Sequence, residues 1–519
     1  MSHTSAQFIP PMSLDLAGEA PLYRQIFEWF RRAILTGTLR PGQRVPSTRD
    51  LAGALNVSRI PVLSAYELLI AEGYFTPLTG VGTCVALTIP GSRAPPGGES
   101  GWASRAVSSS AAAKRRVSRR AALLRGPAHR WLQEMPATSS GIGVPDEFPI
   151  GIWSRLVARH ARRISGDLMA YGDPLGVAPF RAALARYLGA FRGIRCDESQ
   201  ILVTTGAQQA LQICALAVLD PGDGVWIEEP GYPGAHQALR AAGGQLVPVP
   251  VDSEGLDVAY GSHCDHRVRA AYVTPAEQFP LGVTMSEARR RELLSWAERR
   301  SAWLIEDDYG GEFCSGGHLR APLQTLDTGG RVLYVGSLSA VMFPALRLGY
   351  IVVPEDLVDT FIAVRNASDL FPSPLYQLAM ADFMREGHLS RRLKRLRAAC
   401  AEHGRALAAA LRSDLSDMLE VVPGEAATRL LALLPIGVSD IEVVHGVSIA
   451  GLRIKVLSQC YVHPPARGGL LMDHASLELE GIPEGLFALR AAIRRCSRQA
   501  ALEPAPGCTR WHDALREPA

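Results

Sequence analysis

Apolar and polar residues alternate differently along the chain, and the change in pattern marks two structured regions. Between residues 21 and 88, apolar residues recur at helical spacing in three short stretches, and a glycine-punctuated hairpin pattern follows. From residue 141 to about 500, apolar β-like runs alternate with amphipathic stretches, which predicts a parallel or mixed sheet flanked by helices. We expect four segments: a front domain over 15–88, a linker over 89–140, a main domain over 141–500 and a loosely ordered tail over 501–519.

The linker differs from its neighbours in composition. Pro, Gly, Ser, Ala and Arg dominate it and apolar periodicity is weak, so a mostly irregular chain with some helix near Ala121 is expected.

The front domain carries start and stop signals for three helices. The first has apolar residues at helical spacing and ends at Gly37. Ser47 can cap the second helix, with Asp50 three residues on as the partner of a short capping box. Ser58 is expected to cap the third helix, and Pro61 falls in its first turn, where a missing N–H does little harm.

The stretch "YFTPLTGVGTCVAL" after the third helix predicts a hairpin with glycines at its tip. Three helices followed by such a wing form a winged helix-turn-helix, an α+β unit, and residues 21–88 resemble the GntR family of DNA-binding regulators. The resemblance implies that the third helix enters the major groove of double-stranded DNA. The residues that it assigns to DNA contacts are Arg49, Ser58, Arg59, Gly80 and Gly82.

The third helix departs from the family pattern at one point. The pair Ile60-Pro61 stands where members of the family usually carry small polar residues, so the family's base preference cannot be assumed for this chain, whereas the fold is unaffected. The alternative for Arg49 and Arg59 is that they are ordinary surface charges on a protein-binding module.

The charge balance favours DNA as the partner of the front end. The net charge is only +3, but residues 1–140 hold 16 Lys and Arg against 8 Asp and Glu, and the remainder holds 38 against 43. A basic front end on an acidic body suits a polyanionic partner, whereas an ordinary solvated surface is the other explanation.

Cysteine usage and the lack of targeting signals indicate the cellular compartment. The nine cysteines form no CxxC pair, so neither a metal site nor a disulfide framework is indicated. No secretory signal and no apolar run of about 18 residues is present, so a cytoplasmic protein without a membrane span is expected, bound to the bacterial nucleoid when on DNA.

The main domain carries ordered motifs. They are "AYGDPLG", "VTTGAQQAL", "EEPGYPGA", "TPAEQFPLGVTMS", "IEDDYGGEF" and "VGSLSAVMFPALRLGYIV". Together with the winged helix they resemble the MocR/GabR regulators, in which a GntR-type reader is fused to an α/β, fold-type-I aminotransferase-like domain. The resemblance implies a homodimer and a pocket for pyridoxal 5'-phosphate.

The resemblance distributes the cofactor's contacts over several motifs. Asp307 matches the carboxylate that pairs with the pyridinium nitrogen, and the alternative is a loop aspartate or a helix cap. Tyr309 and Tyr232 match aromatic residues at the ring. The turn in "TTGAQQ" opens a helix, whose free N–H groups favour a phosphate, and an arginine adds bidentate donors. The full set is Gly206, Ala207, Gln208, Tyr232, Gln278, Asp307, Tyr309, Ser337, Ser339 and Arg347.

The residue that normally forms the imine with the cofactor is a lysine, and Ala340 stands at its position. Alanine can neither form an imine nor move a proton, and such acid–base help is worth roughly 10²–10⁴ in rate. We therefore expect no catalytic residue and cofactor binding that is at most non-covalent. A pocket that is empty, or that holds a different anionic ligand, is the alternative.

Other motif positions depart from the family pattern too. Glu277 replaces a usual histidine, Gly310 replaces an acidic residue, and Asp473-His474 replaces Gly-Tyr or Gly-Phe. No arginine clearly matches the one that grips a substrate carboxylate, since Arg467 is only a neighbour. Several changes around one pocket favour natural loss of the chemistry over a single designed substitution.

These observations predict a transcription regulator whose reader binds an operator and whose body dimerises and senses a small-molecule effector. An aminotransferase with an accessory domain, and a scaffold that no longer reads DNA, are the alternatives.

Overall fold

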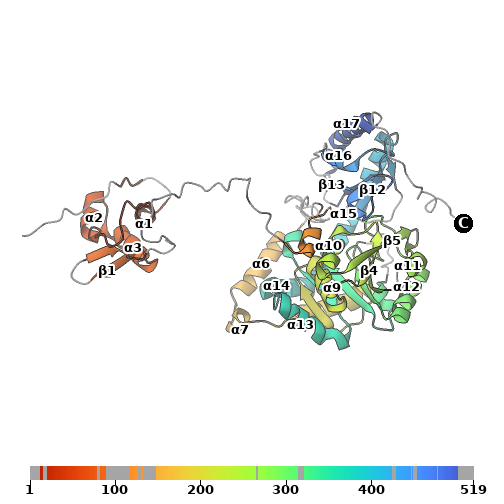
Figure 1. Cartoon of the computed structure of the whole chain (residues 1–519), viewed down its shortest axis with the longest axis horizontal. Coiled ribbons are helices and arrows are strands. Elements are labelled where there is room, and N and C mark those ends of the chain that lie inside the picture. Colours follow the sequence, from red (N-terminus) through yellow and green to blue (C-terminus); the bar gives the residue numbers. More distant parts are fainter. Residues whose placement is uncertain are drawn as a thin grey trace, which may run out of the picture. The chain divides into compact units, whose positions relative to one another are not determined.

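The computed structural model describes residues 12–15, 20–78, 82–88, 117–126, 131, 148–264, 267–313, 321–422, 428–445, 447, 453–475 and 477–500. The chain forms two compact units, which divide between Arg115 and Arg116 (Figure 1). Gly80 lies outside the described residues, as does the tail from residue 501 onward.

The first unit is the predicted winged helix. Its elements are α1 (Leu22–Leu35), α2 (Thr48–Leu55), α3 (Arg59–Ala71), β1 (Phe75–Leu78) and β2 (Gly82–Val85). The strands pair antiparallel, with Leu78 opposite Gly82. Phe30 is fully buried and meets Tyr66 and Phe75 edge-to-face, so one aromatic cluster joins α1, α3 and the wing.

The two predicted helix caps differ. Ser47 caps α2 as expected: its hydroxyl accepts the Asp50 N–H at 3.2 Å and donates to the Asp50 carboxylate at 2.7 Å. Ser58 is the N-cap residue of α3, but its side chain makes no capping hydrogen bond, so that prediction was wrong. The reason is Pro61 at the third helical position, because proline has no N–H to donate to the cap.

The second unit is built on an eight-stranded sheet. In spatial order the strands are β3 (Ile201–Thr204), β10 (Gly349–Val352), β9 (Val332–Ser337), β8 (Trp303–Asp307), β7 (Val268–Val273), β4 (Gly224–Glu229), β5 (Gln245–Asp252) and β6 (Gly255–Leu256). The strands from β9 to β5 are parallel to their neighbours, whereas β10 and β6 run antiparallel. This is the mixed, mostly parallel sheet predicted from the apolar runs.

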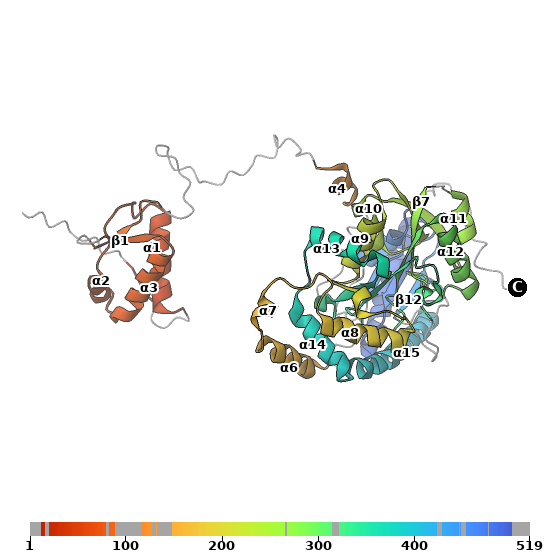
Figure 2. The ribbon, with the colours of Figure 1, turned by 90° about the horizontal axis from the view of Figure 1, so that it is seen from below.

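Helices cover both faces of this sheet (Figure 2). On β9, Leu333 and Val335 join the core under α9 (Ala207–Val218), α10 (Pro233–Ala242) and α13 (Val358–Ser368), because successive side chains of a strand point to opposite faces. Tyr334 faces the other way. The helices on that side are α6 (Ile150–Ala161), α8 (Ala178–Tyr187), α11 (Val258–Cys264), α12 (Glu287–Arg300) and α14 (Pro374–Arg385).

A smaller subdomain follows the long helix α15 (His388–Asp414). Its antiparallel sheet has the order β11 (Glu420–Val421), β12 (Arg429–Leu433), β14 (Gly469–Asp473) and β13 (Arg453–Val456). The remaining helices are α4 (Arg119–Leu123), which confirms the helix expected near Ala121, α7 (Gly166–Met169), α16 (Asp440–His445) and α17 (Ile482–Ala500).

Short irregular helices complete the second unit. They are 3-10 turns at Glu198–Gln200, Leu323–Leu326, Pro344–Leu346, Glu355–Leu357, Ser458–Cys460 and Leu479–Gly481, and a π-helical turn at Leu188–Arg192. Among the described residues, no helix has the length and apolarity that a membrane crossing requires.

Candidate DNA-contacting surface and cofactor pocket

The start of α3 presents the residues expected to meet DNA. Ser58 and Arg59 are exposed, and Arg49 is exposed one residue into α2. The Arg59 Nε donates to the Thr48 hydroxyl at 3.2 Å, so the N-terminal ends of α2 and α3 lie side by side. Two helix starts that share one surface offer free N–H groups to phosphates.

The wing adds a residue that sequence reasoning missed. Arg44 forms an isolated antiparallel bridge with Cys84, and its guanidinium packs on Gly82, where an added Cβ would lie 3.3 Å from Nε. Gly82 has a φ of +108°, which a side chain rarely tolerates. Arg44 lies in a loop without periodicity, so only pairing between distant segments could have identified it.

Three consecutive acids at the end of β8 have three different environments. Glu306 accepts the N–H groups of Leu323 and Gln324. Asp308 is bound by Arg192 at 2.5 Å and by the Tyr334 hydroxyl at 2.5 Å. Protein donors hold both of these carboxylates, although the Asp308 Oδ1 is buried without a partner among the described residues. The middle residue of the three is held by a single hydroxyl.

Asp307 is that middle residue. Its Oδ2 accepts the Tyr272 hydroxyl at 2.9 Å, while Oδ1 is buried and has no hydrogen-bond partner among the described residues. Burial raises the pKa of this carboxyl to about 7. A buried acceptor without a donor is costly, and the N–H of a protonated pyridine ring would satisfy it.

The phosphate end is a turn between β3 and α9. Gly206 is the N-cap of α9 with a φ of +97°, and Ala207 and Gln208 form the first turn, so their backbone N–H groups are free of intrahelical partners. The Gln208 side chain donates to the Gly234 carbonyl at 2.8 Å, and therefore only its backbone remains available to an anion.

Arg347 reaches this turn from the end of the 3-10 turn Pro344–Leu346, just before β10. A Cβ added at Gly206 would lie 2.8 Å from the Arg347 Nη2, so the exposed guanidinium lies directly against the turn. Gly349 permits the approach, because a Cβ there would meet the Gly206 backbone at 2.8 Å. A bidentate cation beside a helix N-terminus is a strong phosphate site.

The loop after β9 completes this end. Ser337 accepts the Ser339 N–H at 3.3 Å, and the buried Ser339 hydroxyl has no partner among the described residues. Ala340 follows and is half-buried.

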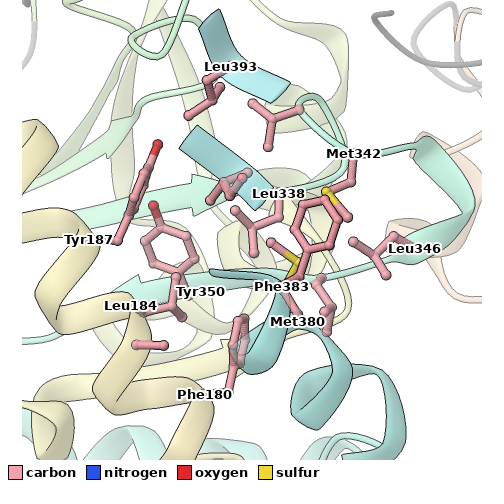
Figure 3. Packing of buried hydrophobic residues seen from close by; sticks show 14 of the residues in the cluster. Phe180, Leu184, Tyr187, Leu338, Met342, Leu346, Tyr350, Met380, Phe383 and Leu393 are labelled. Carbon is pink, nitrogen blue, oxygen red and sulfur yellow. The ribbon is translucent and has the colours of Figure 1, made fainter. Parts of the chain in front are cut away.

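Apolar side chains hold this loop in place. Leu338, Met342 and Leu346 point into the core beside Phe180, Met380 and Phe383 (Figure 3). From α15, Arg392 donates to the carbonyls of Val341 and Met342. The alternation of apolar and polar residues in "SLSAVMF" therefore separates core contacts from pocket contacts.

Aromatic rings form the outer wall. Tyr232 and Phe279 meet edge-to-face at 5.4 Å, and Phe279 meets Tyr309 at 5.9 Å. Burial raises the pKa of Tyr232 to about 12 and also raises the pKa of Tyr309, so both phenols stay neutral hydrogen-bond donors. A Cβ at Gly234 would lie 2.4 Å from the Tyr232 ring, which explains the small residue in "PGYPG".

Gln278 is buried. Its amide donates to Glu228 and to the carbonyls of Pro230 and Phe279, and its oxygen accepts the Leu281 N–H at 3.0 Å. The side chain therefore ties two loops together.

The small sheet contributes residues that sequence reasoning missed. One pleat face carries Arg429, Arg453, Lys455 and Asp473, since these positions alternate in register across β12, β14 and β13. Arg429 binds Asp473 at 2.8 Å and lies 4.6 Å from the Phe279 ring centre. Arg467 is elsewhere, with Glu420 and the Leu434 carbonyl.

The unusual motif residues are matched to each other. A Cβ at Gly310 would lie 2.8 Å from the Glu277 carboxylate, so the glycine makes room for the acid. A Cβ at Gly404 would lie 2.9 Å from the His474 ring, and burial lowers the pKa of that imidazole to about 4. Each of these two glycines therefore leaves the space that its neighbouring side chain fills.

Two family models cover these regions. Residues 22–85 match the bacterial regulatory proteins of the gntR family, and residues 149–435 match aminotransferase class I and II. The probable rhizopine catabolism regulatory protein MocR of Rhizobium meliloti is 36% identical over 489 residues, which is 94% of this chain and 97% of that protein. An uncharacterised HTH-type transcriptional regulator of Bacillus subtilis, YhdI, is 30% identical over 92% of this chain and 97% of its own.

Solved structures resemble the second unit. LysN, an alpha-aminoadipate aminotransferase of Thermus thermophilus complexed with N-(5'-phosphopyridoxyl)-L-leucine, has a TM-score of 0.66 and 26% identity over 74% of this chain and 98% of that chain. A Pyrococcus horikoshii kynurenine aminotransferase has a TM-score of 0.65 and 26% identity over 73% and 97% of the two chains.

Proposed function

The chain belongs to the MocR-type transcription regulators, in which a gntR-family reader precedes a fold-type-I aminotransferase domain, and from this we propose a specific division of labour. The reader binds operator DNA, and the body, a homodimer, holds pyridoxal 5'-phosphate non-covalently and senses an effector without turning it over.

The unpaired Asp307 oxygen is the observation that carries the cofactor proposal. It lies at the end of β8 with a buried acceptor, while Gly206 and Arg347 form an anion site at the neighbouring turn. A ring with a protonated nitrogen and a phosphate fits both. When bound, pyridoxal phosphate supplies an electron-accepting ring to amino compounds.

The chain's own residues bind and orient this group without performing chemistry on it. Asp307 would accept the ring N–H, Tyr232 and Tyr309 would enclose the ring, and Arg347 would hold the phosphate. Ala340 has no amine, so no group at that position can tether the cofactor or carry a proton. Retention of the cofactor without turnover follows.

An apolar surface supports the homodimer. Ile150 on α6, Met169 on α7 and Tyr171 in the following loop are 64%, 74% and 84% exposed. Tyr376 on α14 is also exposed, and α14 packs on α6. Exposed apolar residues over adjoining elements are typical of a subunit interface.

The cofactor is tested by calorimetry and an absorbance spectrum after incubation with pyridoxal phosphate. We expect binding heat without covalent attachment, and the bound group should be lost on dialysis. Absence of both heat and a visible-range band would remove the cofactor from the proposal. Turnover with an excess of amino donor would instead support the enzyme alternative.

The reader is tested by gel shift with the DNA upstream of the chain's own gene. Arg59→Ala should weaken binding and lower the salt slope by about one. Arg32→Ala, at an exposed position of α1, is the matched control and should change little. No shift at low salt would favour the scaffold alternative.

A further inference from the structure

A tryptophan of the linker lies inside the aromatic wall of the pocket. Trp131 is only 4% exposed, although it is 101 positions before Tyr232 in the chain. Its ring meets Tyr232 at 5.6 Å and Phe279 at 6.0 Å, both edge-to-face. The linker thereby contributes a ring to the same cluster that encloses the cofactor site.

The small sheet places positive charge against this ring. The Lys455 ammonium lies 4.1 Å from the centre of the Trp131 ring, and burial lowers the pKa of the lysine. Asp473 is the acid on this pleat face, opposite both Arg429 and Arg453 in the strand register. Glu277 is a second acid near Arg429, whereas Lys455 lies opposite Leu471 in the strand register, so no carboxylate stands directly opposite this ammonium across the strands.

The indole is incompletely satisfied where it lies. Its Nε1 is buried and has no hydrogen-bond partner among the described residues. A buried donor without an acceptor costs free energy and opposes burial of the ring. The Trp131 ring therefore packs well against its aromatic neighbours, but its indole N–H lacks a hydrogen-bond acceptor among the described residues.

The chain before Trp131 is attached to the body. Helix α4 packs on α10, and Gln237 of α10 donates to the Leu124 carbonyl at 2.9 Å. Helix α10 begins immediately after Tyr232, so one helix holds both the upstream linker and a wall of the Trp131 site.

We propose that Trp131 is a tethered occupant of the effector site, and that an aromatic carboxylate binds in its place. The ligand's ring lies against Tyr232 and Phe279, and its carboxylate pairs with Lys455, which the indole meets only through its ring face. This inference rests on the proposed sensing role of the body and specifies its ligand.

Displacement of Trp131 couples the ligand to the linker. The indole and the ligand compete for one space, so apparent affinity is reduced by the fraction of molecules in which Trp131 occupies it. Ligand binding therefore releases a part of the segment that joins the body to the reader.

The direct test is calorimetry on the full-length protein with 3-indolepropionate, which combines the indole with a carboxylate and lacks an amine. Trp131→Ala should bind it at least about tenfold more tightly than the unaltered chain, because the competitor is gone. Trp102→Ala, a tryptophan removed from the same linker segment, is the control and should leave affinity unchanged. Equal or weaker binding by Trp131→Ala would overturn the proposal.

The charge requirement is tested by Lys455→Met, which keeps the length of the side chain. The unaltered chain should prefer 3-indolepropionate to neutral 3-methylindole, and this variant should lose the preference. An undiminished preference, with circular dichroism showing an intact fold, would refute the role of Lys455.

Release of the linker before Trp131 can be measured by limited proteolysis in the absence of DNA. In the unaltered chain, 3-indolepropionate should accelerate tryptic cleavage at Arg119, Arg120 and Arg125, while Trp131→Ala should already be cleaved rapidly without it. If neither 3-indolepropionate nor the Trp131→Ala substitution changes the cleavage rate, release of the linker is excluded. If the gel shift fails while the calorimetry and proteolysis give the expected results, the proposed regulator function is refuted, but the role of Trp131 as an occupant of the ligand site is not.

Discussion

The two ends of the proposed cofactor site in the second unit differ in whether their polar side chains have partners within the protein. At the inner end, the Asp307 Oδ1 and the Ser339 hydroxyl are buried without partners among the described residues, and Arg347 lies exposed against Gly206. At the outer end, Arg429 is paired with Asp473 and covered by the Phe279 ring. The inner end has atoms ready for a ligand, whereas the outer end supplies most of its own partners.

This difference is informative because native proteins satisfy almost all of their buried polar groups. Unpaired groups that cluster around a pocket indicate a ligand, and paired groups indicate that the protein has taken the space for itself. Ala340 lies in the loop that ends the inner region, between the proposed cofactor contacts and the paired groups of the outer end. At the outer end, the Trp131 Nε1 and the His474 Nδ1 are also buried without partners among the described residues, and the unpaired indole is what we expect of a replaceable occupant.

The largest effect should come from Ala340→Lys. If the inner end is intact, the new amine should attach pyridoxal phosphate covalently, and borohydride reduction should make the added mass permanent in a mass spectrum. Ala340→Met is the control of similar length and should gain no mass. Transamination should still be absent, because the outer wall remains filled. An unmodified lysine, in a protein that binds the cofactor, would show that residue 340 is not at the aldehyde.

Arg429→Met should destabilise the outer end. Removing one partner of this partly buried ion pair leaves Asp473 with less compensation, and we expect a loss of about 2 kcal/mol, between the values for exposed and for buried pairs, because both side chains retain some exposure and Arg453 lies opposite the same acid. The double change Arg429→Met with Asp473→Leu should recover most of the loss. The urea midpoint of the body measures both, and no loss in the single variant would show that the pair is dispensable.

Arg347→Ala should weaken the inner end without unfolding it. Charge-assisted hydrogen bonds to phosphate are each worth about 1.5–3 kcal/mol, and exposure of the guanidinium reduces this, so cofactor affinity should fall about ten- to a hundredfold. Calorimetry with pyridoxal phosphate measures it. Arg300→Ala, at an exposed position of α12, is the control, and an equal fall in both variants would argue against a specific phosphate contact.

The smallest effect concerns pH. Burial raises the Asp307 pKa from an ordinary value near 4 to about 7, so the folded chain binds more protons and loses stability as pH rises through that window. Asp307→Asn should make the thermal midpoint of the cofactor-free protein less dependent on pH between 5 and 8. Glu228 and Glu306, whose pKa values burial also raises to about 7, should preserve part of the slope. An unchanged slope would mean that Asp307 is already ionised.

The apolar periodicity predicted the fold, and the family resemblance pointed to the inner end. Gly206, Asp307, Ser339 and Arg347 lie in short motifs at strand ends, and the strand order brings the ends of β3, β10, β9 and β8 together. Their role as cofactor contacts stays a prediction.

The outer end was inaccessible to the same reasoning. Arg429 and Asp473 are 44 positions apart and meet only through the register of β12 and β14. Trp131 and Lys455 come from segments with no motif of their own. The Ser58 cap failed for a local reason that could have been foreseen, because the proline two residues after the first helical position removes the donor.

The fit of Glu277 against Gly310 makes the two positions depend on each other. A Cβ at 310 would lie 2.8 Å from the Glu277 Oε2 and 3.0 Å from its Cβ, so a larger residue at 310 requires the Glu277 side chain to move. Substitutions at 277 and 310 are therefore expected to be non-additive, as for residues in direct contact. A lysine introduced at 340 alone would leave this pair, and the space that it fills, unchanged.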